Sequence, residues 1–324
     1  MIDSRAWDVV VVGGTNTDHL VRAPALPEPG ATVQGDVYVE SPGGKGANQA
    51  LACARLGARA AFVSRVGAEA RGDAAIAALE AEGVDASHVA RDEDAPTGVA
   101  LIAVDASGEK SIVTAPGANH RVRVADVEEA TRLLHRARVV LLQLELPLDA
   151  VEAAVRAAHA GGARVVLDPA PPPSRPLAED VLRLVDLIRP DAGEARALTG
   201  IEVRDRASAR DAAEVLLRRG VGAACVQAGS AGDLLVWRGG ERWLPRLPVR
   251  SVDATGAGDA FAAALAVMLA EGRPLDDAGP FASAAAALTT TKLGAQAALP
   301  RRDEVEALLL SAGLPVPGPR AAVP

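Results

Sequence analysis

The chain has 324 residues, 49% of them hydrophobic, so it can bury a large core, and we favour one α/β domain with an insertion over two smaller domains. Its 34 basic against 42 acidic residues give a net charge of −8, which argues against a general nucleic-acid or anionic-membrane binder and favours a small-molecule partner. Cys53 and Cys225 have no paired spacing, which argues against a disulfide framework or a zinc site. No basic-then-apolar leader opens the chain, so we expect a cytoplasmic protein.

Short β-branched runs alternate with Ala- and Leu-rich stretches of helical period. The predicted strands cover residues 9–12, 60–66, 139–144, 165–167, 184–188 and 223–227. Among the segments between them, residues 47–56, 149–160 and 207–219 are predicted helices. This alternation indicates βαβ units and therefore an α/β fold with a doubly wound, mostly parallel sheet.

Two stretches interrupt this rhythm. Residues 19–40 and 97–114 alternate polar and apolar side chains around turn residues, which predicts short antiparallel strands in a small sheet over the large one. We expect the large domain to comprise residues 1–18, 41–95 and 120–312, and the small sheet residues 19–40 and 96–119. The Pro-rich residues 313–324 are expected to be disordered.

Polar side chains follow several predicted strands. Asn16 and Asp18 follow the first strand, Lys45 and Asn48 begin the next helix after a glycine pair, and Glu145 follows a third strand. Each motif alone could be a turn, a flexible loop or a helix cap. Because strand ends converge at one edge of a parallel sheet, these groups could together bind a hydroxyl-rich ligand such as a sugar.

The segment Gly256-Ala257-Gly258-Asp259 precedes a long apolar run and predicts the start of a helix. Free N–H groups in a first helical turn favour an anion such as phosphate, and a carboxylate beside that anion could take a proton from an attacking hydroxyl. The alternative is a tight turn with an acidic residue at the positive end of a helix. No Gly-Lys-Ser/Thr phosphate loop occurs in the sequence.

In this order the motifs resemble the ribokinase (PfkB-type carbohydrate kinase) family. The similarity runs from about Asp8 to Leu310, and the blocks at residues 43–48 and 256–259 are its most specific signatures. The other matching segments are Gly14-x-Asn16-x-Asp18, Thr97-Gly98-Val99-Ala100, Gly117-Ala118-Asn119, Gln143-Leu144-Glu145, Asp168-Pro169-Ala170-Pro171, Gly229-Ser230 and Gly294-Ala295-Gln296.

The resemblance implies an ATP-dependent sugar kinase, with D-ribose as the expected substrate. The rivals are a related kinase for another furanose or a nucleoside, and a non-catalytic sugar sensor. The presence of Asp259 with its glycines argues against a sensor, which needs no base. The small sheet would be a lid hinged at Gly43-Gly44 and would double as a homodimer interface.

Site roles follow from the same resemblance. The sugar would be held by Asn16, Asp18, Gly44, Lys45, Asn48 and Glu145, with Asp259 as the base and the backbone N–H groups of Gly256, Ala257 and Gly258 as the anion hole. The nucleotide would lie against Asp191, Gln227, Gly229, Ser230, Gly232 and Gly258. Mg²⁺ would be held through water by Glu194, and K⁺ by Asp253 and Thr255 with Gly294 and Ala298.

Three positions depart from the family pattern. Asp191 stands where a family asparagine precedes the glutamate at Glu194, Asp168 replaces another asparagine, and Thr114 replaces an aliphatic residue of the sugar pocket. Asp191 and Glu194 also have the spacing of a helix capping box, and both roles can coexist. These departures bear on pocket polarity and metal demand, and they leave the reaction class unchanged.

Overall fold

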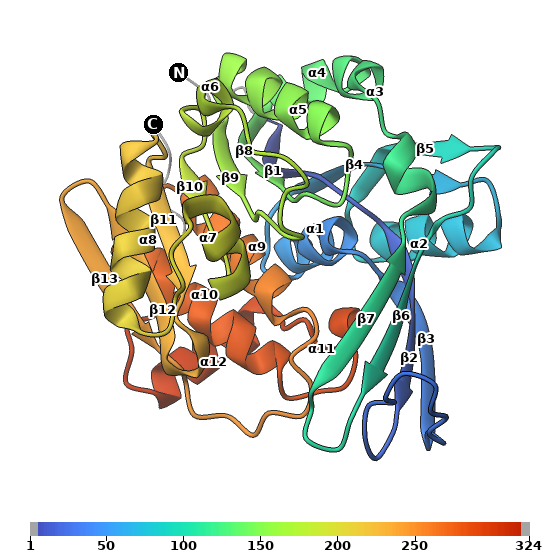
Figure 1. Cartoon of the computed structure of the whole chain (residues 1–324). Helices are drawn as coiled ribbons and strands as arrows, with labels where there is room; N and C mark the ends of the chain where they lie inside the picture. Colours follow the sequence, from blue (N-terminus) through green and yellow to red (C-terminus); the bar gives the residue numbers. More distant parts are fainter. Residues whose placement is uncertain (1–5, 319–324) are drawn as a thin grey trace.

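The computed structural model describes residues 6–318, which form two sheets (Figure 1). The large sheet is parallel through its centre and carries helices on both faces, which confirms the predicted α/β fold. From one edge to the other its nine strands are β13 (Gly240–Pro245), β12 (Gly232–Trp237), β11 (Ala223–Gln227), β10 (Leu187–Ile188), β9 (Arg164–Leu167), β8 (Ala137–Leu142), β1 (Trp7–Val12), β4 (Ala60–Gly67) and β5 (Asp85–Asp92).

All six predicted strands of this sheet are present, with differences in extent. Strand β8 ends at Leu142, and β10 is reduced to two residues because the chain before it closes a helical turn, in which the Val185 N–H donates to the Leu182 carbonyl. The sequence prediction missed β5 and the antiparallel edge hairpin of β12 and β13. Gly239 lies between β12 and β13 and adopts φ +99°. A glycine at this point of the sequence is the turn residue from which the hairpin could have been predicted.

Alternate residues of the central strands feed two apolar cores, one on each face of the sheet. Val9 and Val11 pack with α1 (Lys45–Arg55), α2 (Ala70–Ala81), α9 (Ala257–Ala270), α10 (Leu275–Thr289) and α12 (Arg302–Ser311). Val10 and Val12 pack with α3 (Val124–Glu129), α4 (Thr131–His135), α5 (Leu148–Ala160), α6 (Glu179–Leu182), α7 (Ala192–Thr199) and α8 (Arg206–Arg218). Helices α1, α5, α8 and α9 are among those that the sequence predicts.

The small sheet has the strand order β3 (Val37–Gly43), β2 (Asn16–Arg22), β6 (Gly98–Val104) and β7 (Lys110–Ala115). Its pairs β2–β3 and β6–β7 are antiparallel as predicted, whereas β2 and β6, which belong to different hairpins, run parallel. Figure 1 shows these strands projecting from the side of the large domain. The inner face buries Leu20, Ala100, Ile102 and Val104, and Gly43 leads directly into α1.

Residues 313–318 are packed, in contrast to the predicted disorder of the whole tail. Leu314 and Val316 are partly buried against the core that contains α12, and the Arg273 guanidinium donates to the Gly318 carbonyl. Pro315, between these two apolar side chains, did not prevent their partial burial. Residues 319–324, also predicted to be disordered, lie outside the described residues. In residues 6–318 no helix has both the length and the apolar character needed to span a membrane.

Candidate active site

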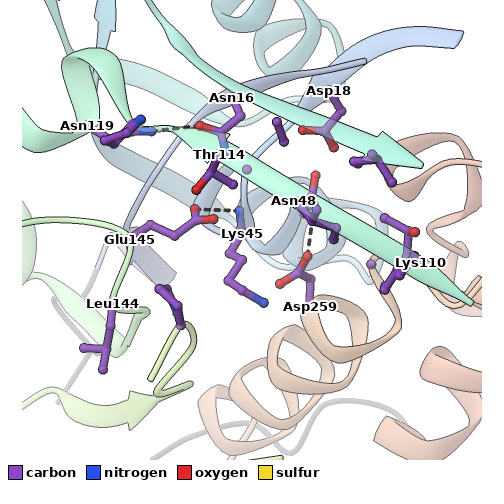
Figure 2. Close-up of a pocket in the computed structure, with 18 of the residues that line it drawn as sticks. Asn16, Asp18, Lys45, Asn48, Lys110, Thr114, Asn119, Leu144, Glu145 and Asp259 are labelled. Carbon is purple, nitrogen blue, oxygen red and sulfur yellow. Dashed lines mark hydrogen bonds between the residues drawn. The ribbon is translucent and has the colours of Figure 1, made fainter. Parts of the chain in front are cut away.

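A cavity of about 360 Å³ lies between the small sheet and the carboxyl edge of the large one (Figure 2). Every side chain predicted to hold the sugar lines it. Asn16 and Asp18 come from β2, Gly44 caps α1, Lys45 and Asn48 lie in its first turns, and Glu145 follows β8. Asp259 reaches the same cavity from the first turn of α9. Segments far apart in the sequence are therefore brought together as the convergence of strand ends predicts.

Glycines allow the close approach of β1, β3 and α1. Gly44 has φ +88°, and a Cβ there would lie 2.7 Å from the Asn16 nitrogen. A Cβ on Gly46 would lie 2.5 Å from the Gly13 carbonyl carbon, and one on Gly43 would meet the Asp18 carboxylate at 2.1 Å. Side chains at these positions would be too close to backbone atoms or to the Asp18 carboxylate, so they would displace the groups predicted to hold the sugar.

Asp259 is 5% exposed and is held by two amides. Asn48 Nδ2 donates to its Oδ2 at 2.9 Å, and Gln49 Nε2 donates to its Oδ1 at 3.2 Å. Figure 2 shows Asn48 and Asp259 facing each other across the cavity floor. Gly256, with φ +81°, is the N-cap of α9, so the backbone of Ala257, Gly258 and Asp259 forms the first helical turn. Within the described part of the chain, the Ala257 N–H makes a single hydrogen bond, a long one of 3.3 Å to the Ala254 carbonyl.

Burial and mutual repulsion shape the charges in this cavity. Burial, and then the nearby Asp259 carboxylate, raise the pKa of Asp18 to about 7. Burial raises the pKa of Glu145 to about 7 despite Lys45, whose backbone N–H donates to Glu145 Oε2 at 2.9 Å. Burial of the Lys45 amine is outweighed by Asp259, Asp168 and Glu145, which together raise its pKa. The site thus carries several carboxyls around the ammonium group of Lys45.

A second cavity, of about 620 Å³, meets the first at Lys45, Lys110, Gly256 and Asp259. Of the residues predicted to contact the nucleotide, it is lined by Asp191, Gln227, Ser230 and Gly258. Gly229 and Gly232 flank Ser230 but are not in its lining. Glu194 lines the same cavity.

Asp191 and Glu194 form the capping box that their spacing indicates. Asp191 is the N-cap of α7, where its Oδ1 accepts from the Glu194 N–H and Glu194 Oε2 accepts from the Asp191 N–H, each at 2.8 Å. Burial, and then Asp168, raise the pKa of Glu194 to about 7. Because both carboxylates also face the second cavity, the cap does not exclude a role toward phosphates or a cation.

The predicted K⁺ residues lie around one buried carboxylate. Asp253 Oδ1 accepts from the N–H and hydroxyl of Thr255, and its Oδ2 accepts from the Gly294 N–H at 2.9 Å. Ala298 ends the short helix α11 (Ala295–Ala298) that follows Gly294. Asp253 therefore joins the loop before α9 to the loop before α11. Among residues 6–318 no cluster of three or more His, Cys, Asp or Glu side chains is arranged to hold a metal.

Sequence reasoning missed three residues of the site. Lys110 lines both cavities from β7, whereas Ile112 and Thr114 line the first cavity only. This period-two pattern was readable in the predicted strand. Asn119, part of a family motif with no role assigned, holds the first strand end by accepting from the Thr15 N–H and donating to Asn16 Oδ1. Gln49 joins Asp259 to Asp168, to which it donates at 2.8 Å. Its position in the middle of a helix gave no signal.

Two adjoining cavities with a carboxylate and a helix N-terminus at their junction suit group transfer between two bound molecules. The sequence model described as the pfkB family carbohydrate kinase matches residues 7–302. The chain belongs to this family and is an ATP-dependent carbohydrate kinase of the ribokinase type.

Relatives and solved structures agree with this assignment. The chain is 39% identical over 296 residues to a ribokinase of Haemophilus influenzae, covering 91% of this chain and 96% of the relative. It resembles a ribokinase structure from Thermotoga maritima with a TM-score of 0.82 and 34% identity, covering 93% and 99% of the two chains. The Arabidopsis thaliana ribokinase solved with ribose and ATP has a TM-score of 0.83 and 32% identity, with 93% and 98% covered.

Proposed function

We propose that this kinase transfers the terminal phosphoryl group of ATP to the primary hydroxyl of D-ribose, giving ribose 5-phosphate and ADP. The proposal rests on two adjoining cavities. The first is lined by Asn16, Asp18, Lys45, Asn48 and Glu145, and it meets the second, larger cavity at Asp259. The Arabidopsis relative solved with ribose and ATP supports this choice of substrates. Because ATP is the cosubstrate, we propose that the enzyme works in the cytoplasm.

In the proposed mechanism Asp259 takes the proton of the sugar hydroxyl as its oxygen forms the new bond to phosphorus. The bond from phosphorus to the ADP oxygen breaks, and the backbone N–H groups of Gly256, Ala257 and Gly258 face the charge on the transferred group. Asn48 and Gln49 donate to both Asp259 oxygens and so fix the carboxylate. Positioning and electrostatic stabilisation supply most of the rate.

Two cations fit the residues present. Mg²⁺ carried by the nucleotide would neutralise phosphate charge, with Glu194 holding it through water. Asp168 lines the same cavity as Glu194, and its buried Oδ1 accepts no hydrogen bond from residues 6–318. K⁺ would bind at the Asp253 and Thr255 loop with backbone carbonyls near Gly294 and Ala298, and would order the start of α9. Asp253 supports this role because it already joins the two loops.

The small sheet would act as a lid and as an interface. Residues 19–40 and 96–119 would close over the sugar about the Gly43-Gly44 hinge. The outer face of the small sheet carries the exposed apolar side chains Val21, Tyr38, Leu101 and Val113, which line a shallow hollow. Covering such a face is favourable, and a second copy of the chain supplies the same surface, so we propose a homodimer through the lid.

One assay tests the reaction. ADP release is measured with ribose, deoxyribose, fructose and adenosine in turn, each in potassium and in sodium buffer. We expect ribose to give the highest kcat/KM and potassium to raise it. Preference for another sugar or for adenosine would indicate a related kinase of the same family. The polar Thr114 in the proposed sugar cavity favours this alternative. No ADP release with any acceptor would point to a sensor, and equal rates in the two buffers would remove K⁺ from the mechanism.

A further inference from the structure

The arginine that follows β10 has no role in the reaction as described so far. Arg189 is 6% exposed, yet its side chain lines the second cavity together with Asp191 and Glu194. A guanidinium is always charged and carries five N–H donors. Burying it is costly unless acceptors are close by. Arg189 therefore requires hydrogen-bond acceptors close to its guanidinium.

Within residues 6–318 the Arg189 guanidinium makes no hydrogen bond, and its Nε is a buried donor with no partner. Its nearest ion-pair oxygen is Asp233 Oδ1, 3.8 Å from Nη2, which is too far for a hydrogen bond. Asp233 is shared, because its Oδ2 lies 3.3 Å from Arg246 Nη1. The Phe261 ring, whose centroid is 5.1 Å from the Arg189 Cζ, supports the flat face of the guanidinium but accepts none of its edge donors.

The guanidinium reaches the start of α9. A Cβ built on Gly258 would lie 3.0 Å from Arg189 Nη1, so the missing side chain at Gly258 leaves room for the arginine. Positive charge from Arg189 and the positive end of the α9 dipole therefore meet at one place. Five carboxyls line the same cavity and would repel an anion, those of Asp168, Asp191, Glu194, Asp233 and Asp259. Arg189 is placed to offset them.

We propose that Arg189 is a phosphate-binding residue that donates to an oxygen of the terminal phosphates of the nucleotide at the start of α9, and that it offsets the Asp191 carboxylate there. This role rests on the proposed function in that the second cavity takes ATP. The competing explanation is that Arg189 only balances the buried charge of Asp233. The two explanations differ in whether the arginine distinguishes a phosphorylated from an unphosphorylated nucleoside.

The test is calorimetric binding of ADP and of adenosine to Arg189→Gln and to the unmodified protein, with no turnover required. A lost hydrogen bond to a charged group predicts ADP binding weakened by about 10- to 100-fold, with adenosine binding changed less than about 3-fold. Equal changes for both ligands, or none for ADP, would overturn the proposal. If the protein binds ADP in this way but phosphorylates no acceptor, the proposed function fails while the Arg189 site stands.

Three further variants complete the experiment. Arg189→Lys keeps the charge but loses the planar guanidinium, so its ADP affinity should lie between those of the unmodified protein and Arg189→Gln. If Arg189→Gln does not fold, the ADP affinity of Arg189→Lys tests the proposal instead. Arg302→Gln is the matched control, because Arg302 also lies over a phenylalanine, Phe281 at 5.5 Å, but lines neither cavity. Its ADP affinity should be unchanged. Asp191→Asn added to Arg189→Gln should recover part of the lost ADP affinity, and no recovery would contradict the offset of Asp191.

Discussion

Asp259 is the residue on which the proposed chemistry depends, and Asp259→Asn tests it. Asparagine keeps the size of the side chain but cannot take the proton, so turnover should fall by about 10²- to 10⁴-fold. ATP affinity should change little, because the anion hole is backbone. Steady-state kinetics with a melting curve separate loss of the base from loss of the fold.

A matched control exists outside both cavities. Asp205 caps α8, where its Oδ1 accepts from the Ser208 N–H, and it lines neither cavity. Asparagine caps a helix about as well as aspartate, so Asp205→Asn should leave turnover unchanged. Near-normal turnover in Asp259→Asn, with Asp205→Asn equally active, would remove Asp259 as the base.

Asp18 gives a prediction about pH and stability. Its pKa in the folded protein is raised to about 7, first by burial and then by Asp259, from an ordinary value of 3.8. The folded state therefore holds a proton that the unfolded chain has lost, so the wild type loses stability as pH rises from about 4 to about 7. Asp18→Asn removes this loss. The Tm of the variant minus that of the wild type should be larger at about pH 8 than at about pH 5.

Asp205→Asn again serves as the control for Asp18. Hydrogen bonds from Ser208 lower the pKa of Asp205, so this carboxyl stays ionised throughout that pH range and its Tm difference should be flat. A flat difference for Asp18→Asn as well would mean that Asp18 titrates normally in the folded protein. Thermal melts without ligand are the measurement, because a sugar in the cavity would add its own linkage.

Among the secondary-structure elements, the junction of β3 with α1 controls the shape of the proposed sugar cavity. Gly44→Val places a branched side chain at φ +88° against the Asn16 nitrogen. We expect a higher KM for the sugar together with a lower kcat, because the small sheet and the first turn of α1 can no longer meet. Kinetics over a range of sugar concentrations provide the measurement. An unaltered sugar KM would count against a hinge at this position.

The control for Gly44 must share its backbone strain. Gly30, in the loop between β2 and β3, has φ +84°, and a Cβ there would meet nothing within 4 Å. Gly30→Val should therefore cost a similar backbone strain without blocking any contact, and its sugar KM should stay at the wild-type value. Gly44→Ala, which is smaller, should fall between the wild type and Gly44→Val.

At the scale of the whole molecule, the outer face of the small sheet predicts the oligomeric state. Val113, on β7, is 65% exposed within an apolar surface. A glutamate there would be buried without a partner in a dimer, so Val113→Glu should convert the dimer to a monomer in light scattering. Leu310→Glu is the control, because Leu310 is 68% exposed on α12, away from that face. A wild-type protein that is monomeric throughout would contradict the proposed interface.

The sequence by itself determined the parallel sheet and most of the polar residues that line the first cavity. Short β-branched runs specify β1, β4 and β8, and helical periods specify α1 and α5, because their apolar side chains are buried on both faces of a strand or on one face of a helix. The glycine motifs around Gly44 and Gly256 were readable because a positive φ or a close backbone approach requires glycine there. The strand-end rule then predicted that their neighbours would converge.

Only the tertiary structure decided the details that depend on distant partners. The parallel pairing of β2 with β6 joins two hairpins far apart in the chain, and no local pattern encodes it. Gln49 contacts Asp259 and Asp168 across more than 100 residues. Arg189 becomes a phosphate ligand candidate only once its burial, its missing acceptors and its approach to Gly258 are known. Hydrogen bonding and charge at a site depend on spatial neighbours, whereas local patterns specify only each segment's own conformation and buried face.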